Sequence, residues 1–206
     1  FEIVVAIFRD IERYSQAMIF ATINWKQSRV DPSLVYDLFE LSKKRSCEKV
    51  SHDIVKLLNE NDSSAWKWKV KMLWRGDGII SQSAMIKEFI KLLDRWVLNS
   101  FYQQEEDGKI YKILENYFNS INFVFPAEFW NKEYILSKTT GFSAFMRFFS
   151  DLYDTAKLRQ QSLVISFFTE RLKLAKAWLK NLTSTNYVSW AKGQAELYND
   201  LKKSIS

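Results

Sequence analysis

The scarcity of chain-breaking residues constrains the fold of this chain more than any other feature of its sequence. Only five glycines and two prolines occur in 206 residues. Sandwiches and barrels need many turns, and turns rely on these residue types. The sequence therefore predicts helices joined by short connections. Aromatic residues make up 16% of the chain, and most of these large rings are expected to lie in its core.

Apolar residues recur at intervals of three and four along most of the chain, which predicts a succession of helices. Asp31-Pro32 has the composition of a helix start, with Asp as the N-cap and Pro at the first helical position. Ser81 or Ser83 is expected to cap a later helix. The expected helices cover residues 10–24, 32–41, 48–59, 85–97, 109–123, 140–153, 162–182 and 186–205.

Two short segments have the pattern of β-strands. Phe1–Phe8 is mostly apolar, and residues 66–72 alternate apolar and basic side chains with a period of two before a turn at 75–78. A lone buried strand leaves its backbone groups without partners, so we expect the first strand to pair with strands upstream or in another chain. The predicted fold class is mainly α with a small α/β portion. Residues 1–153 are expected to form one domain, with a helical hairpin at 154–206 packed on it.

The sequence contains no self-contained catalytic or metal-binding motif. His52 is the only histidine and Cys47 the only cysteine, which supports neither a histidine-dependent nucleophile nor a structural zinc site. No phosphate-binding or dinucleotide-binding glycine loop is present. Catalytic residues stay unknown, no metal is expected, and His52 is interpreted as a surface residue of a helix.

Cysteine content and hydropathy bear on the compartment. A single cysteine rules out an internal disulfide framework and favours a reducing compartment. No apolar run reaches the roughly 18 residues that a membrane-spanning helix needs. We therefore expect a cytoplasmic location and no membrane partner.

The charge of the chain favours polyanions. Its formal net charge is +6 and its pI is about 9.2, which promotes salt-dependent binding to nucleic acid. The alternative is that this charge contributes only to solubility. Tryptophans alternate with cations in one segment, and such rings stack bases while the cations hold phosphates. The alternative there is a half-buried strand with a wet basic face. The expected nucleic-acid-binding residues are Lys67, Lys69, Lys71 and Arg75.

Two other segments have the composition of ligand sites. Residues 137–141 precede a predicted helix, where free N–H groups, hydroxyls and a lysine suit an anion; ordinary N-capping is the alternative. Residues 24–29 place two amides and two cations in a connection near a strand end, where ligands often bind in α/β units. The candidate residues are Asn24, Lys26, Gln27, Arg29, Lys138, Thr139 and Thr140.

Three separated patches, taken together and in order, resemble the DGQHR-domain family, which includes DndB-type proteins associated with DNA phosphorothioation. The first contains residues 19–27 (IFATINWKQ) and 30–34 (VDPSL), the second residues 76–83, and the third residues 125–142. The resemblance covers roughly residues 1–153. The Asp-Gly-Gln-His-Arg run that names the family is not in this sequence, and in family members it lies just upstream of the strand that Phe1–Phe8 resembles.

The resemblance implies a remnant of a ParB/sulfiredoxin-like core followed by a helical bundle. It implies a component of a DNA-modification (phosphorothioation-like) or phage-defence system that binds DNA, nucleotide or both as a regulator or accessory factor. Residues 24–29 would then lie near the nucleotide or phosphate, and residues 138–140 would form a second anion contact. The implied partners are DNA and other DNA-modification proteins, and a homo-oligomer stays open.

The resemblance leaves the cofactor and any enzymatic activity to the complete protein. ATP or another nucleotide is the implied cofactor there, and ATP hydrolysis, implied for some relatives, is not assigned to this chain. The alternative function is a non-enzymatic protein–protein interaction module with incidental basic charge. An independent ATPase or nuclease is the third reading.

Overall fold

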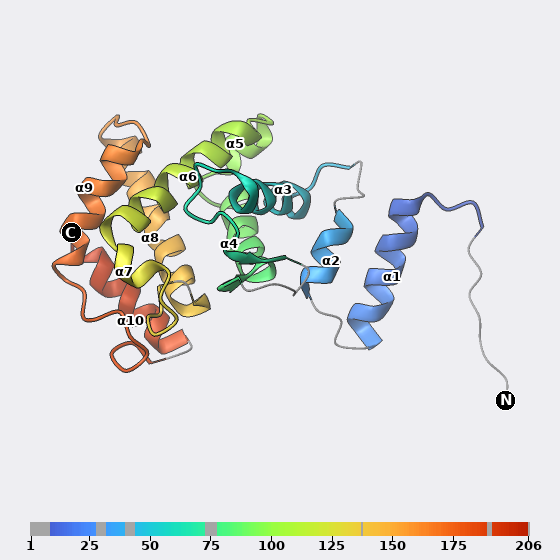
Figure 1. The fold of residues 1–206 in the computed structure, drawn as a ribbon. Coiled ribbons are helices and arrows are strands. Elements are labelled where there is room, and N and C mark those ends of the chain that lie inside the picture. Colours follow the sequence, from blue (N-terminus) through green and yellow to red (C-terminus); the bar gives the residue numbers. More distant parts are fainter. Residues whose placement is uncertain are drawn as a thin grey trace.

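The structure, a computed structural model, describes residues 9–27, 32–39, 44–72, 78–136, 138–188 and 191–205. These residues form ten helices and two very short strands, so the predicted mainly helical class is confirmed (Figure 1). The strands are β1 (Val70–Lys71) and β2 (Ile80–Ser81), which pair in parallel. The helices are α1 (Arg13–Gln27), α2 (Pro32–Leu38), α3 (Cys47–Glu60), α4 (Gln82–Asp94), α5 (Asn99–Gln103), α6 (Asp107–Val124), α7 (Pro126–Phe129), α8 (Thr139–Leu158), α9 (Ile165–Lys176) and α10 (Ala191–Lys202).

The helices from α3 onward gather into one body, and α1 lies at the far end of the molecule from α9 and α10 (Figure 1). Helix α6 contacts α3, α5, α7 and α9, while α8 contacts α4 and α10. Helix α2 contacts α1, α3 and α4, and so connects α1 to the rest. Among the described helices, none combines the length and apolar character needed to cross a membrane.

The core is aromatic, as its composition predicts. Trp66, Tyr117, Phe148 and Phe149 are fully buried, and the ring of Trp66 makes edge contacts with several neighbouring rings. Residues 141–146 of α8 are all buried, because neighbours cover this helix on more than one side. The removal of these apolar side chains from water is the main force that stabilises the folded chain.

Most expected helices are present with shifted ends. Residues 109–123 lie within α6, 140–153 within α8 and 48–59 within α3. Pro32 is the first residue of α2, as predicted, and the Ser81 side chain accepts a hydrogen bond from Ala84 N (3.3 Å) as the N-cap of α4. The C-terminal pair is shorter than expected, since α9 begins only at Ile165 and α10 only at Ala191.

The predicted strand at residues 66–72 is wrong over most of its length. Only Val70 and Lys71 pair with a neighbour, and the residues from Ala65 to Lys69 form turns. The cause lies in α3, because Asn59 of this helix accepts hydrogen bonds from the backbone N–H groups of Trp68 and Val70. The predicted strand Phe1–Phe8 lies outside the described residues, as do residues 75–77 of the expected turn.

Two further predictions concern His52 and the domain boundary. His52 is not a surface residue: it is 1% exposed, because its face of α3 packs into the core. The domain boundary expected between residues 153 and 154 falls inside α8, and the packing of α9 on α6 and of α10 on α8 joins the two parts closely. That division stays a prediction, as does the ParB/sulfiredoxin-like remnant.

Candidate nucleic-acid interface

The two tryptophans at 66 and 68 lie in opposite environments. Trp66 is fully buried in the aromatic core, whereas 67% of Trp68 is exposed. A stacking role for the Trp66 ring is therefore wrong, because no base can reach it. Trp68 is the described ring of this segment that is free to stack, and Trp74 and Arg75 lie outside the described residues.

The backbone of Trp68 has an uncommon conformation. Its φ is 55°, in the left-handed region that bulky residues rarely adopt. Asn59 accepts two hydrogen bonds that hold it there: Trp68 N donates to Asn59 O (2.9 Å), and Val70 N donates to Asn59 Oδ1 (3.0 Å). Asn59 itself is 6% exposed at the end of α3. Such a backbone costs about 1–3 kcal/mol and persists only where the surroundings enforce it.

The lysines of the segment differ in their partners. Lys67 forms an ion pair with Asp62, which lowers the pKa of that exposed carboxyl. Lys69 Nζ lies 5.4 Å from the centre of the Trp130 ring, in cation–π geometry. Lys71 is partly exposed. Among the described residues neither Lys69 nor Lys71 has a carboxylate partner, so their charge is available to a polyanion.

The predicted anion site at residues 138–140 lies at the N-terminus of α8. Lys138 is the N-cap residue and no side chain caps this end within the described part of the chain. Lys138 and Thr139 are exposed, and Thr140 is partly so. The first N–H groups of a helix have no partner within it, and their positive end suits an anion. The alternative was ordinary N-capping by a side chain. Among the described residues, no side chain caps this helix end.

Gly141 explains how the chain enters α8 so tightly. A Cβ at this position would clash with the carbonyl group of Ile135. Ile135 N in turn donates to Leu182 O (2.8 Å), and Tyr134 bridges Thr183. The connection before α8 thus packs against the first turn of the helix, and only glycine leaves the space for it.

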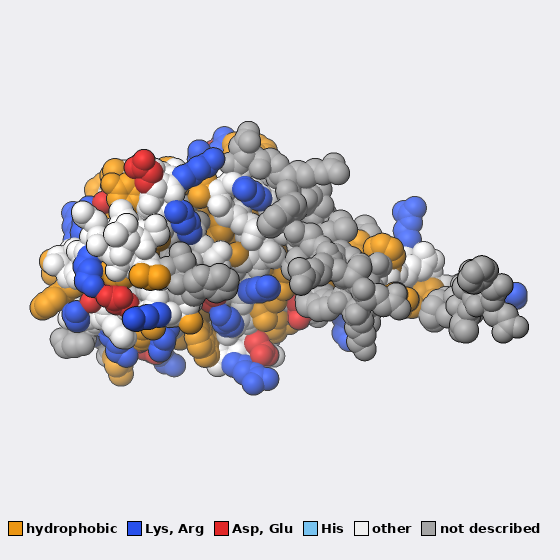
Figure 2. Space-filling view, turned by 90° about the horizontal axis from the view of Figure 1, so that it is seen from below, with side chains coloured by type: hydrophobic (Ala, Val, Ile, Leu, Met, Phe, Trp, Pro, Cys, Tyr) orange, Lys and Arg blue, Asp and Glu red, His pale blue; other side chains and the backbone are white. Residues whose placement is uncertain are grey.

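The basic segment and the start of α8 border the same aromatic cluster. The Trp66 ring centre lies 5.9 Å from that of Phe142, in the first turn of α8, and 5.3 Å from that of Trp130, over which Lys69 lies. Phe142 N donates to Lys138 O (2.9 Å). Two segments that the sequence indicated separately are therefore neighbours in space. Figure 2 shows lysine and arginine side chains spread over the lower face of the molecule, with fewer carboxylates among them.

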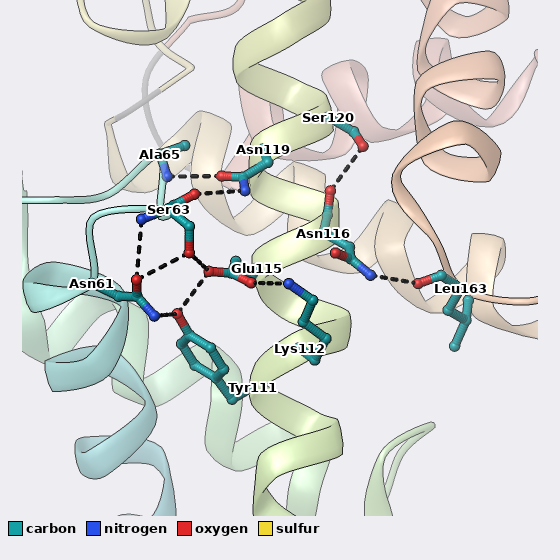
Figure 3. A network of polar contacts seen from close by, with 10 residues as sticks. All are labelled: Asn61, Ser63, Ala65, Tyr111, Lys112, Glu115, Asn116, Asn119, Ser120 and Leu163. Carbon is teal, nitrogen blue, oxygen red and sulfur yellow. Dashed lines mark hydrogen bonds and ion pairs between the residues drawn. The ribbon is translucent and has the colours of Figure 1, made fainter.

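A polar network on α6 holds the loop that leads into the basic segment (Figure 3). Glu115, 1% exposed, accepts hydrogen bonds from Ser63 Oγ (2.5 Å), Tyr111 OH (2.8 Å) and Lys112 Nζ (2.6 Å). Asn119 accepts from Ala65 N and donates to Ser63 O, both at 2.8 Å. These contacts connect residues 61–65 to α6.

The protonation states of this network follow from the same contacts. Burial raises the pKa of Glu115, but the hydrogen bonds from Lys112, Ser63 and Tyr111 outweigh it, so the pKa lies below its usual value. Burial and the neighbouring carboxylate raise the pKa of Tyr111 to about 12. Both groups are therefore constant in charge near neutral pH. Nothing in the sequence pattern singled out this network, whose polar residues look like ordinary loop and helix-surface residues.

The remaining candidate residues are only partly placed. Asn24, Lys26 and Gln27 belong to the last turn of α1, but their side chains lie outside the described part, and so does Arg29. Their role near a nucleotide or phosphate stays a prediction. No group of three His, Cys, Asp or Glu side chains suited to a metal ion occurs in the described ranges.

Comparison with protein-family models, with curated proteins and with solved structures found no match to this chain. The resemblance to the DGQHR-domain family therefore remains a prediction from the residues that carry it.

Proposed function

We propose that this chain binds DNA as a regulator or accessory component of a DNA-modification (phosphorothioation-like) or phage-defence system. The observation that carries the DNA-binding part is Trp68, an exposed ring on a left-handed backbone between Lys67 and Lys69. Exposed rings among cations suit unpaired bases and their phosphates. The assignment to a modification or defence system rests on the family resemblance alone.

Nucleotide binding is a part of this proposal that fewer observations support. Lys138 and the first N–H groups of α8 supply an anion site next to the same aromatic cluster. A phosphate of the DNA backbone or of a nucleotide such as ATP has the required charge and oxygens. Binding of ATP and of DNA at this helix end would then compete.

The test is fluorescence anisotropy with labelled single-stranded and duplex oligonucleotides across a salt series. We expect tighter binding to the single strand and an affinity that falls steeply with salt, since each neutralised phosphate adds roughly 0.7 to the slope for single strands. The same titrations repeated with ATP as a competitor test the nucleotide part. Salt-independent binding, or none, would contradict the proposal.

Two substitutions at one position separate binding from folding. Trp68→Ala removes the ring but keeps the Cβ, and should cost about 1–3 kcal/mol of binding free energy per stacked base. Trp68→Gly should weaken binding equally, while its free energy of unfolding stays within about 1 kcal/mol of the wild type, because glycine accepts a positive φ. Trp178→Ala, which removes another exposed ring at 55% exposure, is the matched control and should bind normally.

A protein-interaction module is the second candidate function, and one surface favours it. Phe123 at the end of α6 is 66% exposed under Lys173 of α9, and Leu174 and Trp178 are half exposed close by in sequence. Large exposed apolar side chains are typical of interaction surfaces where they form one patch. If Phe123→Ser abolishes a self-association seen by sedimentation while DNA binding is absent, this candidate replaces the first.

A further inference from the structure

The three lysines of the basic segment at residues 67–71 differ in what holds their ammonium groups. Lys67 is paired with Asp62, whose carboxylate offsets its charge. Lys69 lies over the Trp130 ring, with its Nζ atom 5.4 Å from the ring centre. Lys71 has neither kind of side-chain partner in the described part of the chain. Of these three side chains, Lys69 is therefore the one that is held in place without losing its charge to a carboxylate.

The backbone of Lys69 is fixed at both of its polar groups. Its N–H group donates to Trp66 O (2.9 Å), and its carbonyl oxygen accepts from Ile79 N (2.7 Å). The second bond lies next to the parallel pairing of β1 with β2. Contacts with two separate segments therefore fix the point from which the lysine side chain extends.

The ring beneath the ammonium group is fixed as well. Trp130 is partly exposed, and its ring centre lies 4.2 Å from that of Phe129 and 5.3 Å from that of Trp66. Both of these neighbours are fully buried in the aromatic core. The core thus holds the indole in place, and the indole in turn holds the ammonium group of Lys69.

An aromatic ring orders an ammonium group in a different way from a carboxylate. The attraction comes from the quadrupole of the ring, so the full positive charge stays and N–H groups remain able to donate. A long flexible lysine loses much rotamer entropy when a ligand immobilises it, and a group that is already held in place loses less. Lys69 combines an unneutralised charge with a preformed position, and both favour binding of a phosphate.

We infer that Lys69 is the main phosphate contact of the basic segment, beside the base that stacks on Trp68, and that Trp130 is the positioning residue for its ammonium group. This inference rests on the proposed binding of single-stranded DNA. The ligand group is a phosphodiester, so the contact is the same for every base. Lys71 adds charge without a preformed position, and Lys67 adds least because it is already paired.

The test is a double-mutant cycle measured by fluorescence anisotropy, with a labelled oligothymidylate and the full 206-residue chain. Lys69→Ala should weaken binding by about fivefold at about 0.1 M salt and lower the salt slope by about 0.7; Lys71→Ala should have a smaller effect on affinity. Trp130→Leu should weaken binding by about two- to fivefold with an unchanged slope, because the ammonium group still reaches the phosphate but must first be ordered. In the Lys69→Ala background, Trp130→Leu should cause no further loss.

Two variants separate this positioning role from a merely structural one. Trp130→Phe keeps a ring beneath the ammonium group and should retain most of the affinity. Tyr102→Leu is the matched control, because it removes a ring whose centre lies 4.1 Å from the Arg45 guanidinium, before the first turn of α3 and away from Asn59; it should bind normally. Thermal melting by circular dichroism verifies that each variant is folded. A further loss from Trp130→Leu in the Lys69→Ala background would overturn the inference.

A measurement on the unaltered chain keeps the inference testable if Trp130→Leu does not fold. The Cε protons of Lys69 should be shifted upfield in the NMR spectrum by the ring current of the indole, both before and after the oligonucleotide is added. Lys69→Ala identifies the signal, and an unshifted signal would overturn the inference.

The outcomes also separate this inference from the proposed function. If the wild-type chain binds no oligonucleotide, the proposed function fails and the inference fails with it. If Trp68→Ala weakens binding but Trp130→Leu leaves it intact, the inference alone is overturned.

Discussion

Replacing Glu115 by glutamine tests whether the network on α6 holds the loop that leads into the basic segment. The carboxylate is 1% exposed and accepts from Tyr111, Ser63 and Lys112. A hydrogen bond to a charged group contributes about 1.5–3 kcal/mol and a neutral one about 0.5–1.5 kcal/mol. Glutamine keeps one carbonyl oxygen, so each hydroxyl bond is weakened rather than lost.

The expected magnitude follows from these contacts. The two hydroxyl bonds together lose about 2–3 kcal/mol. The bond from Lys112 adds little, because that side chain is 63% exposed and solvent screens the pair. We therefore expect Glu115→Gln to lower the free energy of unfolding by about 2–3 kcal/mol at pH 7.

The pH dependence has a definite sign. The pKa of Glu115 is lower in the folded chain than its ordinary value, so its stabilising contribution is present above the unfolded pKa of about 4.3 and is lost as the pH falls through the folded pKa. The gap between wild type and Glu115→Gln should therefore be largest near neutral pH and close on acidification.

Urea denaturation followed by circular dichroism, at neutral and at acidic pH, measures this gap. Glu133→Gln, a change at an exposed carboxylate, is the control and should stay within about 0.5 kcal/mol of the wild type. A Glu115→Gln variant as stable as that control at pH 7, or a gap that widens on acidification, would refute the assignment of the network.

Three other predictions concern the glycine at the start of α8, the asparagine behind Trp68 and the lysine of the anion site. Gly141→Ala should destabilise the chain strongly in a thermal melt, since its Cβ would clash with the Ile135 carbonyl, whereas Gly108→Ala, which meets nothing within 4 Å, should be neutral or stabilising by up to about 1 kcal/mol. Asn59→Ala leaves Val70 N without its acceptor and should lower the free energy of unfolding by about 1–3 kcal/mol and weaken single-strand binding in anisotropy titrations; normal binding would show that Trp68 needs no support. Lys138→Ala should reduce the salt slope of DNA binding by about 0.7–1. Lys157→Ala, at the other end of α8, is the control. An unchanged slope for Lys138→Ala would show that Lys138 is not part of the interface.

The local pattern of the sequence determined the helices. Apolar residues at intervals of three and four predicted α3, α6 and α8 within a few residues of their ends. Of the two serines expected to cap the next helix, Ser81 and Ser83, the first is the N-cap of α4. Such signals are short-range, because helix periodicity and capping involve residues within a turn or two of one another. The basic character of the segment at 67–71 was likewise readable from the sequence.

Contacts between distant residues decided the rest. Period two at residues 66–72 predicted a strand, but Asn59 and the aromatic core direct Trp66 inward and hold Trp68 outward. The burial of His52, the neighbourhood of Trp66 with the first turn of α8, and the position of Lys69 over the Trp130 ring all depend on residues from separate elements. A one-dimensional pattern shows which face of an element is apolar, and only packing decides which other element covers that face.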